Sequence, residues 1–186
     1  MEVPAINDLH PGTDRGAPVS AAGGFTIVEL VTVIILLGIL SMVAMARFVQ
    51  PSAFVPGIVG QKLVAESRIA QQLAVSRADA RVSLRLDRQG GDWRMQVSTD
   101  VDGVLRTELV DADNSRIQAT SGGASAFITA ATALSVGYSQ SGDLSAVLIG
   151  TTVGDATLGV DLLVAGDSDR QVCIHPSGYS ASAACI

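Results

Sequence analysis

"RVSLRLDRQGGDWRMQVSTD", residues 81–100, contains the clearest strand pattern in the chain. Apolar side chains alternate with polar ones on both sides of the pair Gly90-Gly91. The alternating apolar residues are Val82, Leu84, Leu86, Trp93, Met95 and Val97. A period of two is typical of a strand with one buried face, and two adjacent glycines fit a tight turn. The stretch therefore predicts a β-hairpin.

The same period recurs towards the C-terminus. A second hairpin is expected around "SQSGD", residues 139–143, and single strands are expected elsewhere. The apolar positions are Leu105, Leu109, Leu134, Val136, Tyr138, Leu144, Ala146, Leu148, Val160, Leu162, Val164, Val172 and Ile174. The small-residue stretch "TSGGASAFITAATA", residues 120–133, is expected to be a long loop. About seven short strands predict an antiparallel β domain over residues 81–186.

A helix is expected before the first hairpin. The stretch "IVGQKLVAESRIAQQLAVSRADA", residues 58–80, is rich in Ala, Gln, Leu and Arg and lacks proline. Pro51 and Pro56 precede it, and proline kinks or breaks a helix. Residues 48–80 are therefore expected to form a kinked helix that packs one face on the β domain.

The most apolar part of the chain is "GGFTIVELVTVIILLGILSMVAMARF", residues 23–48, in which the only charge before Arg47 is that of Glu29. About 20 apolar residues span a bilayer, so residues 25–47 predict a transmembrane helix. A charged acidic side chain costs about 2.5–3.5 kcal/mol at the centre of a helix in lipid, so the presence of Glu29 in this segment calls for an explanation. Residues 1–24, with prolines, small residues and no periodicity, are expected to be a leader peptide.

Composition argues against nucleic-acid binding and suggests a disulfide. The net charge is −6, and Lys62 is the only lysine, whereas nucleic-acid binding needs clustered Lys and Arg.

Cys173 and Cys185 are the two cysteines. Two cysteines close together beyond a membrane segment indicate a disulfide in an oxidising compartment, and two unrelated buried thiols are the alternative.

Neither an enzyme nor a metal site is expected. The histidines are His10 and His175, and no nucleophile-elbow, zinc-protease or phosphate-loop motif is present. His175 beside Pro176 is expected to be a turn residue rather than a base. Acidic turns at residues 100–103, 111–114 and 166–169 could offer oxygen ligands to Ca²⁺, but none completes a calcium-binding loop and Asp favours turns by itself. No cofactor is expected.

The N-terminal motif resembles a known family. Gly24 followed by Phe25 and Thr26, Glu29 four residues after Phe25, and the apolar helix are similar to the class III signal of type IV pilins and pseudopilins. The resemblance implies cleavage by a prepilin peptidase between Gly24 and Phe25 and N-methylation of Phe25. It also implies that Glu29 contacts the amino terminus of a neighbouring subunit during assembly.

The order of the remaining parts also resembles this family, and the stretches at residues 25–48 and 169–186 look most like C-type minor pilins of mannose-sensitive haemagglutinin (MSHA) pili. The implied fold is α+β and pilin-like: a long N-terminal transmembrane helix followed by an antiparallel β-sheet or sandwich domain, closed by a C-terminal disulfide loop. The implied partners are prepilin peptidase, other pilin or pseudopilin subunits and the inner-membrane assembly platform.

The function expected from these features is that of a minor subunit that is incorporated into a type IV pilus or primes its assembly. Its precursor would sit in the inner membrane with a periplasmic C-terminal domain, and the mature protein would sit in the filament. An H-type pseudopilin of type II secretion is the alternative. A periplasmic binding protein with a single membrane anchor is a further one.

Overall fold

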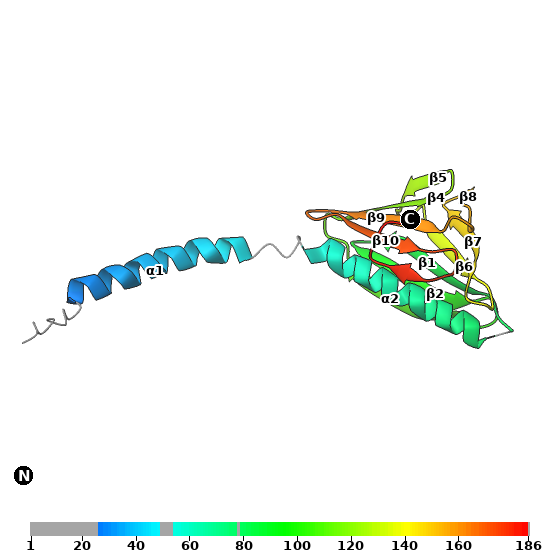
Figure 1. The fold of residues 1–186 in the computed structure, drawn as a ribbon, viewed down its shortest axis with the longest axis horizontal. Coiled ribbons are helices and arrows are strands. Elements are labelled where there is room, and N and C mark those ends of the chain that lie inside the picture. The colour runs from blue at the N-terminus through cyan, green and yellow to red at the C-terminus, as the bar shows by residue number, and fades with distance from the viewer. Residues whose placement is uncertain (1–25, 49–53, 78, 186) are drawn as a thin grey trace, which may run out of the picture. The chain divides into compact units, whose positions relative to one another are not determined.

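The structure is a computed structural model that describes residues 26–48, 54–77 and 79–185; in the first of these ranges the side chains are described as far as residue 42 (Figure 1). The chain divides into two compact units, Met1–Arg47 and Phe48–Ile186. Each unit is described by itself. Gly24 and Phe25, the predicted cleavage site, lie outside the described residues.

The described element of the first unit is helix α1, Ile27–Phe48. Its sequence is rich in Leu, Ile, Val and Met, and it contains one acidic residue, Glu29, in the first turn. Thr26 precedes the first helical residue, which is the position where Ser and Thr commonly cap a helix.

The fold class expected from the sequence, α+β with a long N-terminal transmembrane helix, is wrong. The described chain is mostly β, with two antiparallel sheets and two helices. Among the described residues, no helix is both long enough and apolar enough to cross a membrane.

The second helix, α2, spans Val55–Ser76 and begins the second unit. Pro56 lies in its first turn, where a missing N–H breaks no helical hydrogen bond, so this proline starts the helix instead of kinking it. The helix ends at Ser76, before the expected end near Ala80, and Arg77 is already extended. Its buried residues are Pro56, Val59, Gly60, Leu63, Val64, Glu66, Ser67, Ala70 and Ala74.

The larger sheet has six strands in the order β3-β2-β1-β6-β7-β8. The strands are β1 Val82–Gln89, β2 Asp92–Thr99, β3 Gly103–Asp111, β6 Leu134–Tyr138, β7 Leu144–Ile149 and β8 Thr152–Val153. The predicted first hairpin is confirmed: Gln89 pairs with Asp92, and Gly90 takes a φ of 62° in the turn between them. The second predicted hairpin is also present as β6 and β7.

The smaller sheet has five strands in the order β11-β10-β9-β4-β5. The strands are β4 Arg116–Ser121, β5 Ala124–Phe127, β9 Val160–Ala165, β10 Arg170–Ile174 and β11 Ser180–Ala181. The stretch 120–133 is therefore not a long loop, because its first half contributes to the β4–β5 hairpin. Gly122 turns this hairpin with a φ of 58°.

The core of the second unit lies where α2 and the two sheets meet. Helix α2 packs on β1, β2 and β6 of one sheet and on β9, β10 and β11 of the other (Figure 1). A Cβ added to Gly60 would lie 3.4 Å from a methyl of Val172, so glycine brings this helix close to β10. The largest buried side chains include Trp93 and Tyr138. Both have a partner for their polar atom: Trp93 Nε1 donates to Ser115 Oγ at 2.8 Å, and the Tyr138 hydroxyl lies 2.8 Å from Ser67 Oγ.

Candidate functional site

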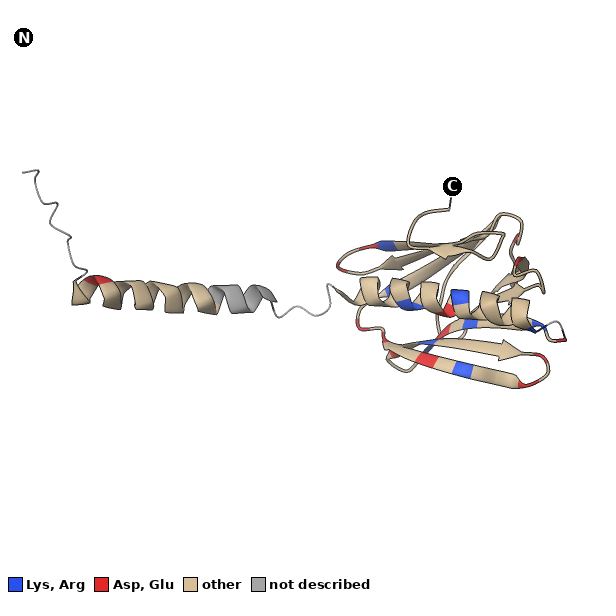
Figure 2. Cartoon of the chain, turned by 60° about the horizontal axis from the view of Figure 1, so that its bottom comes forward, with Lys and Arg blue, Asp and Glu red and all other residues tan. Residues whose placement is uncertain are grey.

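Helix α1 presents an apolar surface on every side. All its described side chains, residues 27–42, are exposed, and the large apolar ones are between 42% and 83% exposed. Figure 2 shows almost no charge along the described part of this helix, in contrast to α2 and the strands. A helix that is apolar all round is normally found covered, because leaving such side chains in water costs about 1.5–3 kcal/mol each. This surface is the first part of the candidate site.

Glu29 belongs to the first turn of α1 and is linked to Thr26. Its backbone N–H donates to Thr26 Oγ1 at 3.2 Å, and Thr32 Oγ1 donates to its carbonyl at 2.9 Å. Thr26-Ile27-Val28-Glu29 has the spacing of a capping box, in which the Glu side chain binds back to the N-cap N–H. The Thr26 half of that box is present here. The capping-box spacing can be recognised from the sequence alone, whereas the family resemblance assigns Glu29 only to a contact between subunits.

Small residues interrupt the apolar surface of α1. Nothing lies within 4 Å of a Cβ added to Gly38, and the Ser41 hydroxyl donates to the Leu37 carbonyl at 2.7 Å. Because Ser41 satisfies its own hydroxyl within the helix, it presents a small and largely apolar surface to a neighbour. Ala44, a further small residue of this helix, lies among the residues whose side chains are not described.

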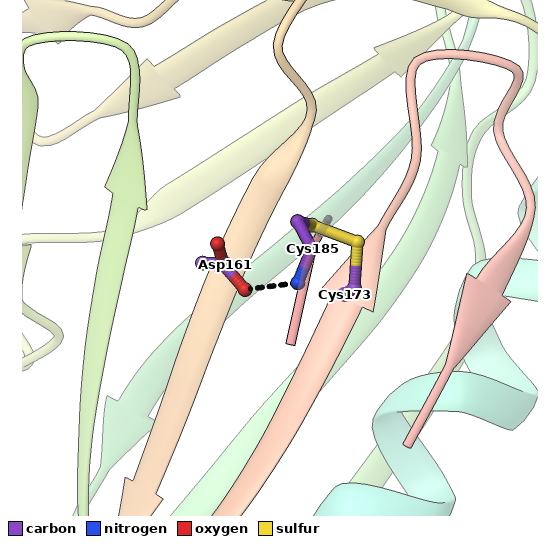
Figure 3. A group of neighbouring side chains, drawn as sticks. All are labelled: Asp161, Cys173 and Cys185. Atoms are coloured by element: carbon purple, nitrogen blue, oxygen red, sulfur yellow. Dashed lines mark hydrogen bonds between the residues drawn. A yellow bond between two sulfur atoms is a disulfide. The ribbon is translucent and has the colours of Figure 1, made fainter. Parts of the chain in front are cut away.

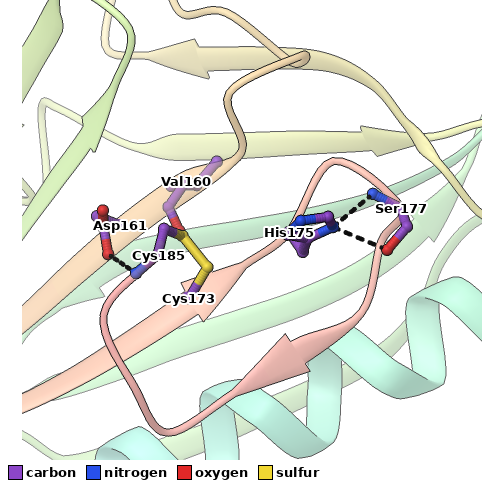
Figure 4. Close-up of a disulfide and its surroundings, with 6 residues drawn as sticks. All are labelled: Val160, Asp161, Cys173, His175, Ser177 and Cys185. Carbon is purple, nitrogen blue, oxygen red and sulfur yellow. Dashed lines mark hydrogen bonds between the residues drawn. A yellow bond between two sulfur atoms is a disulfide. The ribbon is translucent and has the colours of Figure 1, made fainter.

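The predicted disulfide is confirmed. Cys173 of β10 is bonded to Cys185, and their Cα atoms are 5.0 Å apart (Figure 4). The backbone N–H of Cys185 also donates to Asp161 Oδ1 at 2.9 Å, so the chain end is held against β9 as well. The result is a closed C-terminal loop, residues 173–185, that includes β11 and the turn before it.

Three residues have potential metal-ligating atoms within 4.8 Å of one another: Asp161, Cys173 and Cys185 (Figure 3). Both sulfurs are already bonded to each other, and a disulfide sulfur is not the thiolate that binds metals. Asp161 accepts a hydrogen bond from the backbone of Cys185. The group therefore fits a covalent closure of the loop rather than a metal centre.

The C-terminal loop is fastened to α2. Arg68 donates to the Ser180 carbonyl at 3.1 Å, and Gln71 Nε2 donates to the Ser177 carbonyl at 2.8 Å. In the other direction, the Ser180 hydroxyl donates to the Val64 carbonyl at 3.2 Å. The Arg68 guanidinium also lies 5.6 Å from the centre of the Tyr179 ring. Helix α2 therefore fixes the position of this loop on the surface of the domain.

His175 makes a short-range contact with Ser177 in the turn of this loop (Figure 4). Ser177 Oγ lies 3.0 Å from His175 Nδ1, and the Ser177 N–H also points to Nδ1, at 3.4 Å. A nucleophilic serine needs a histidine that a third group orients. Both contacts here come from the residue two positions later, as in a turn. The expectation that the protein is not an enzyme stays a prediction.

The acidic turns use their carboxylates locally. Asp100 accepts from the Arg81 N–H at 2.8 Å, and Asp111 accepts from the Asp113 N–H, also at 2.8 Å. Asp102 pairs with Arg77. Asp169 accepts from the Gly166 N–H at 3.3 Å. Turn formation and ion pairing account for the carboxylates of Asp100, Asp102, Asp111 and Asp169.

Two acids are nearly inaccessible and are paired with arginines. Glu66 of α2 is 1% exposed and binds Arg106 of β3, which raises the pKa of that arginine. Asp87 of β1 is 2% exposed, and hydrogen bonds from Arg94 and Arg85 lower its pKa against the opposing effect of burial. These buried acids hold structural elements together: Glu66 joins α2 to the edge strand β3, and Asp87 joins β1 to β2.

Comparisons with family models, with curated proteins and with solved structures found no match to this chain. The functional argument therefore rests on the residues and their geometry.

Proposed function

We propose that this chain is a minor pilin-like subunit of an MSHA-type type IV pilus and that it acts by polymerisation. The observation that carries the proposal is the described surface of α1, apolar on all sides and exposed along residues 27–42. The same helix in neighbouring subunits is a surface of matching chemistry. Gly38 and Ser41 would allow the two backbones to approach closely.

Processing would create a cationic partner for Glu29. A prepilin peptidase would cleave between Gly24 and Phe25, and Phe25 would become the methylated amino terminus. An acid among packed apolar helices is costly unless a cation lies beside it. The amino group of a neighbouring subunit is such a cation, so this pairing would favour one register between subunits.

The disulfide supports a periplasmic location for the second unit, because disulfides persist in oxidising compartments. In the proposal this unit lies on the outside of the filament. The partners are prepilin peptidase, other pilin-like subunits and the inner-membrane assembly platform.

Glu29 has a local role that must be separated from the proposed one. The geometry of Thr26 and Glu29 is half of a capping box, and an acid in the first turn also complements the helix dipole. Gln replaces Glu well in a capping box but carries no charge. Glu29→Gln therefore removes the proposed ion pair and keeps the local hydrogen bonding.

The experiment compares filament incorporation of Glu29→Gln with that of Thr26→Ala. Thr26→Ala should cost about 1 kcal/mol of local helix stability, and its filaments should retain the subunit. Glu29→Gln should be processed normally but should be lost from filaments. If Glu29→Gln enters filaments as well as the unmodified protein does, the ion pair is refuted and helix capping explains the acid.

A further inference from the structure

Strand β3 leaves a long edge of the larger sheet open. It has nine residues, whereas β8 at the opposite edge has two. In the smaller sheet the edge strands β5 and β11 have four and two residues. Within the described residues no strand lies on the far side of β3, and an open edge offers its N–H and C=O groups to another strand.

The residue types along β3 are arranged nearly symmetrically about Thr107. The sequence around Thr107 is "VLRTELV", residues 104–110. Counting outward from Thr107 gives Arg106 and Glu108 first, then Leu105 and Leu109, then Val104 and Val110. Each pair is apolar with apolar or positive with negative.

We propose that β3 pairs antiparallel with β3 of a second copy of this chain, about a two-fold axis at Thr107. Each Arg106 then lies opposite Glu108 of the other copy, each Leu105 opposite a Leu109, and Thr107 opposite itself. Opposite charges, aliphatic pairs and Thr-Thr pairs are favourable across antiparallel strands. The two six-stranded sheets become one continuous sheet, and the same surface serves on both copies.

The charges select this register. Moving the axis by one residue to Arg106 places two arginines opposite each other, and moving it to Glu108 places two glutamates there; like charges directly opposite are destabilising. Within one chain Arg106 binds Glu66 and Glu108 binds Lys62, yet both side chains stay partly accessible to a partner: that of Arg106 is 48% exposed and that of Glu108 is 24% exposed. The axis at Thr107 is therefore the register that the charged residues favour.

The apolar residues of β3 would also gain cover. Val104, Leu105 and Leu109 are 55%, 42% and 54% exposed. The β2–β3 ladder is irregular at Val97 and Ser98, so Leu105 has no opposite residue on β2 and a bulge interrupts the alternation of β3 there. The regular part of the proposed pairing is therefore centred on Arg106, Thr107 and Glu108. This inference does not rest on the proposed function, because it concerns only the second unit of the chain.

The experiment is oxidative cross-linking of the full chain, kept in a mild non-ionic detergent because α1 is apolar. Directly opposite residues in antiparallel strands have Cα atoms about 4.5–5.5 Å apart, which is within disulfide range. The native cysteines are bonded to each other, so Thr107→Cys adds a single free thiol. Thr120→Cys, an exposed threonine on β4, is the matched control. Thr107→Cys should form several-fold more cross-linked dimer than the control.

Leu109→Cys tests the register. In the proposed pairing the two copies of residue 109 are offset by four positions along the strand, roughly 13 Å, which is beyond disulfide range. Leu109→Cys should therefore cross-link no more than Thr120→Cys. Equal cross-linking of Thr107→Cys and Thr120→Cys, or stronger cross-linking of Leu109→Cys than of Thr107→Cys, would overturn the proposal.

A second measurement needs no substitution. Amide hydrogen exchange over residues 104–110 should slow as the concentration of the unmodified protein rises, while exchange in β8 should not change. Association through α1 alone would leave the exchange of β3 independent of concentration, and that result would also overturn the proposal.

Discussion

The Nε of Arg106 lies 2.8 Å from one carboxylate oxygen of Glu66 and 3.0 Å from the other. The acid is on α2 and is 1% exposed, while the arginine comes from the edge strand β3. The helix is thus tied to the strand at the border of the sheet. Because a buried carboxylate without its cation is costly, this contact should matter more to stability than an exposed ion pair does.

Arg106→Leu should accordingly lower the free energy of unfolding, since it leaves the Glu66 charge buried and unpaired. Replacing both residues, as in Glu66→Leu with Arg106→Leu, should recover most of the loss, because an apolar pair has no charge to desolvate. Urea unfolding measures both effects. Arg116→Leu, at an exposed arginine of β4, is the control. If the double variant is less stable than Arg106→Leu, the contact does not have the role assigned to it.

The disulfide should stabilise the second unit by limiting its unfolded state. The cysteines are 12 positions apart, and a loop of that size is worth on the order of 3 kcal/mol in the chain-entropy model. The double variant Cys173→Ala with Cys185→Ala should lose about that much, and a reductant should then have no further effect on it. A reductant that does not destabilise the unmodified protein would contradict this expectation.

Tyr138 should make the protein sensitive to strong alkali. Burial raises the pKa of its hydroxyl from 10.0 to about 12, and the hydrogen bond with Ser67 only partly offsets this effect. Between these two values the folded protein keeps a proton that the unfolded chain has lost, so stability falls as the pH rises. The shift of about two units corresponds to about 3 kcal/mol.

Tyr138→Phe is the variant that tests this dependence. It removes the titrating group, so its free energy of unfolding should change less between pH 10 and pH 12 than that of the unmodified protein. Tyr179→Phe, at an exposed tyrosine, should leave the dependence unchanged. An equally steep loss of stability in Tyr138→Phe would show that another group is responsible.

The strands with regular alternation could be predicted from the sequence, and those without it could not. The hairpin of β1 and β2 was clear because its apolar residues keep a period of two around Gly90. In β7 the buried residues are Leu144, Val147 and Ile149, although Leu144, Ala146 and Leu148 were expected. A register shift between Gly137 and Tyr138 interrupts the alternation, and a bulge of this kind has no clear sequence signal.

Other strands could not be recognised from the sequence because of their amino-acid composition. The β4–β5 hairpin is built largely from Ser, Thr, Ala and Gly, and its buried residues include Ala119 and Ala124, which a search for large apolar side chains overlooks. At the candidate site, the disulfide followed from the cysteine spacing. The link between Thr26 and Glu29 was legible as a capping pattern, whereas the loop contacts of Arg68 and Gln71 join residues far apart in the sequence.

The minor-subunit proposal predicts a particular deletion phenotype. Removing this chain should abolish or sharply reduce filaments, while the major pilin should accumulate unassembled. Immunoblots of sheared filaments and of cell fractions measure the two pools. Purified filaments that consist mainly of this chain would contradict a minor role but would be consistent with a pilin-like protein.

The central claim is that the chain is processed and assembled as a pilin-like subunit. The most direct test is the amino terminus of the mature protein, determined by N-terminal sequencing and mass spectrometry after expression with a prepilin peptidase. The proposal predicts that the mature chain begins at a methylated Phe25 and that Gly24→Ala leaves most of the precursor uncut. A mature chain that still begins at Met1, or that begins at Arg47 after cleavage by another peptidase, would contradict it.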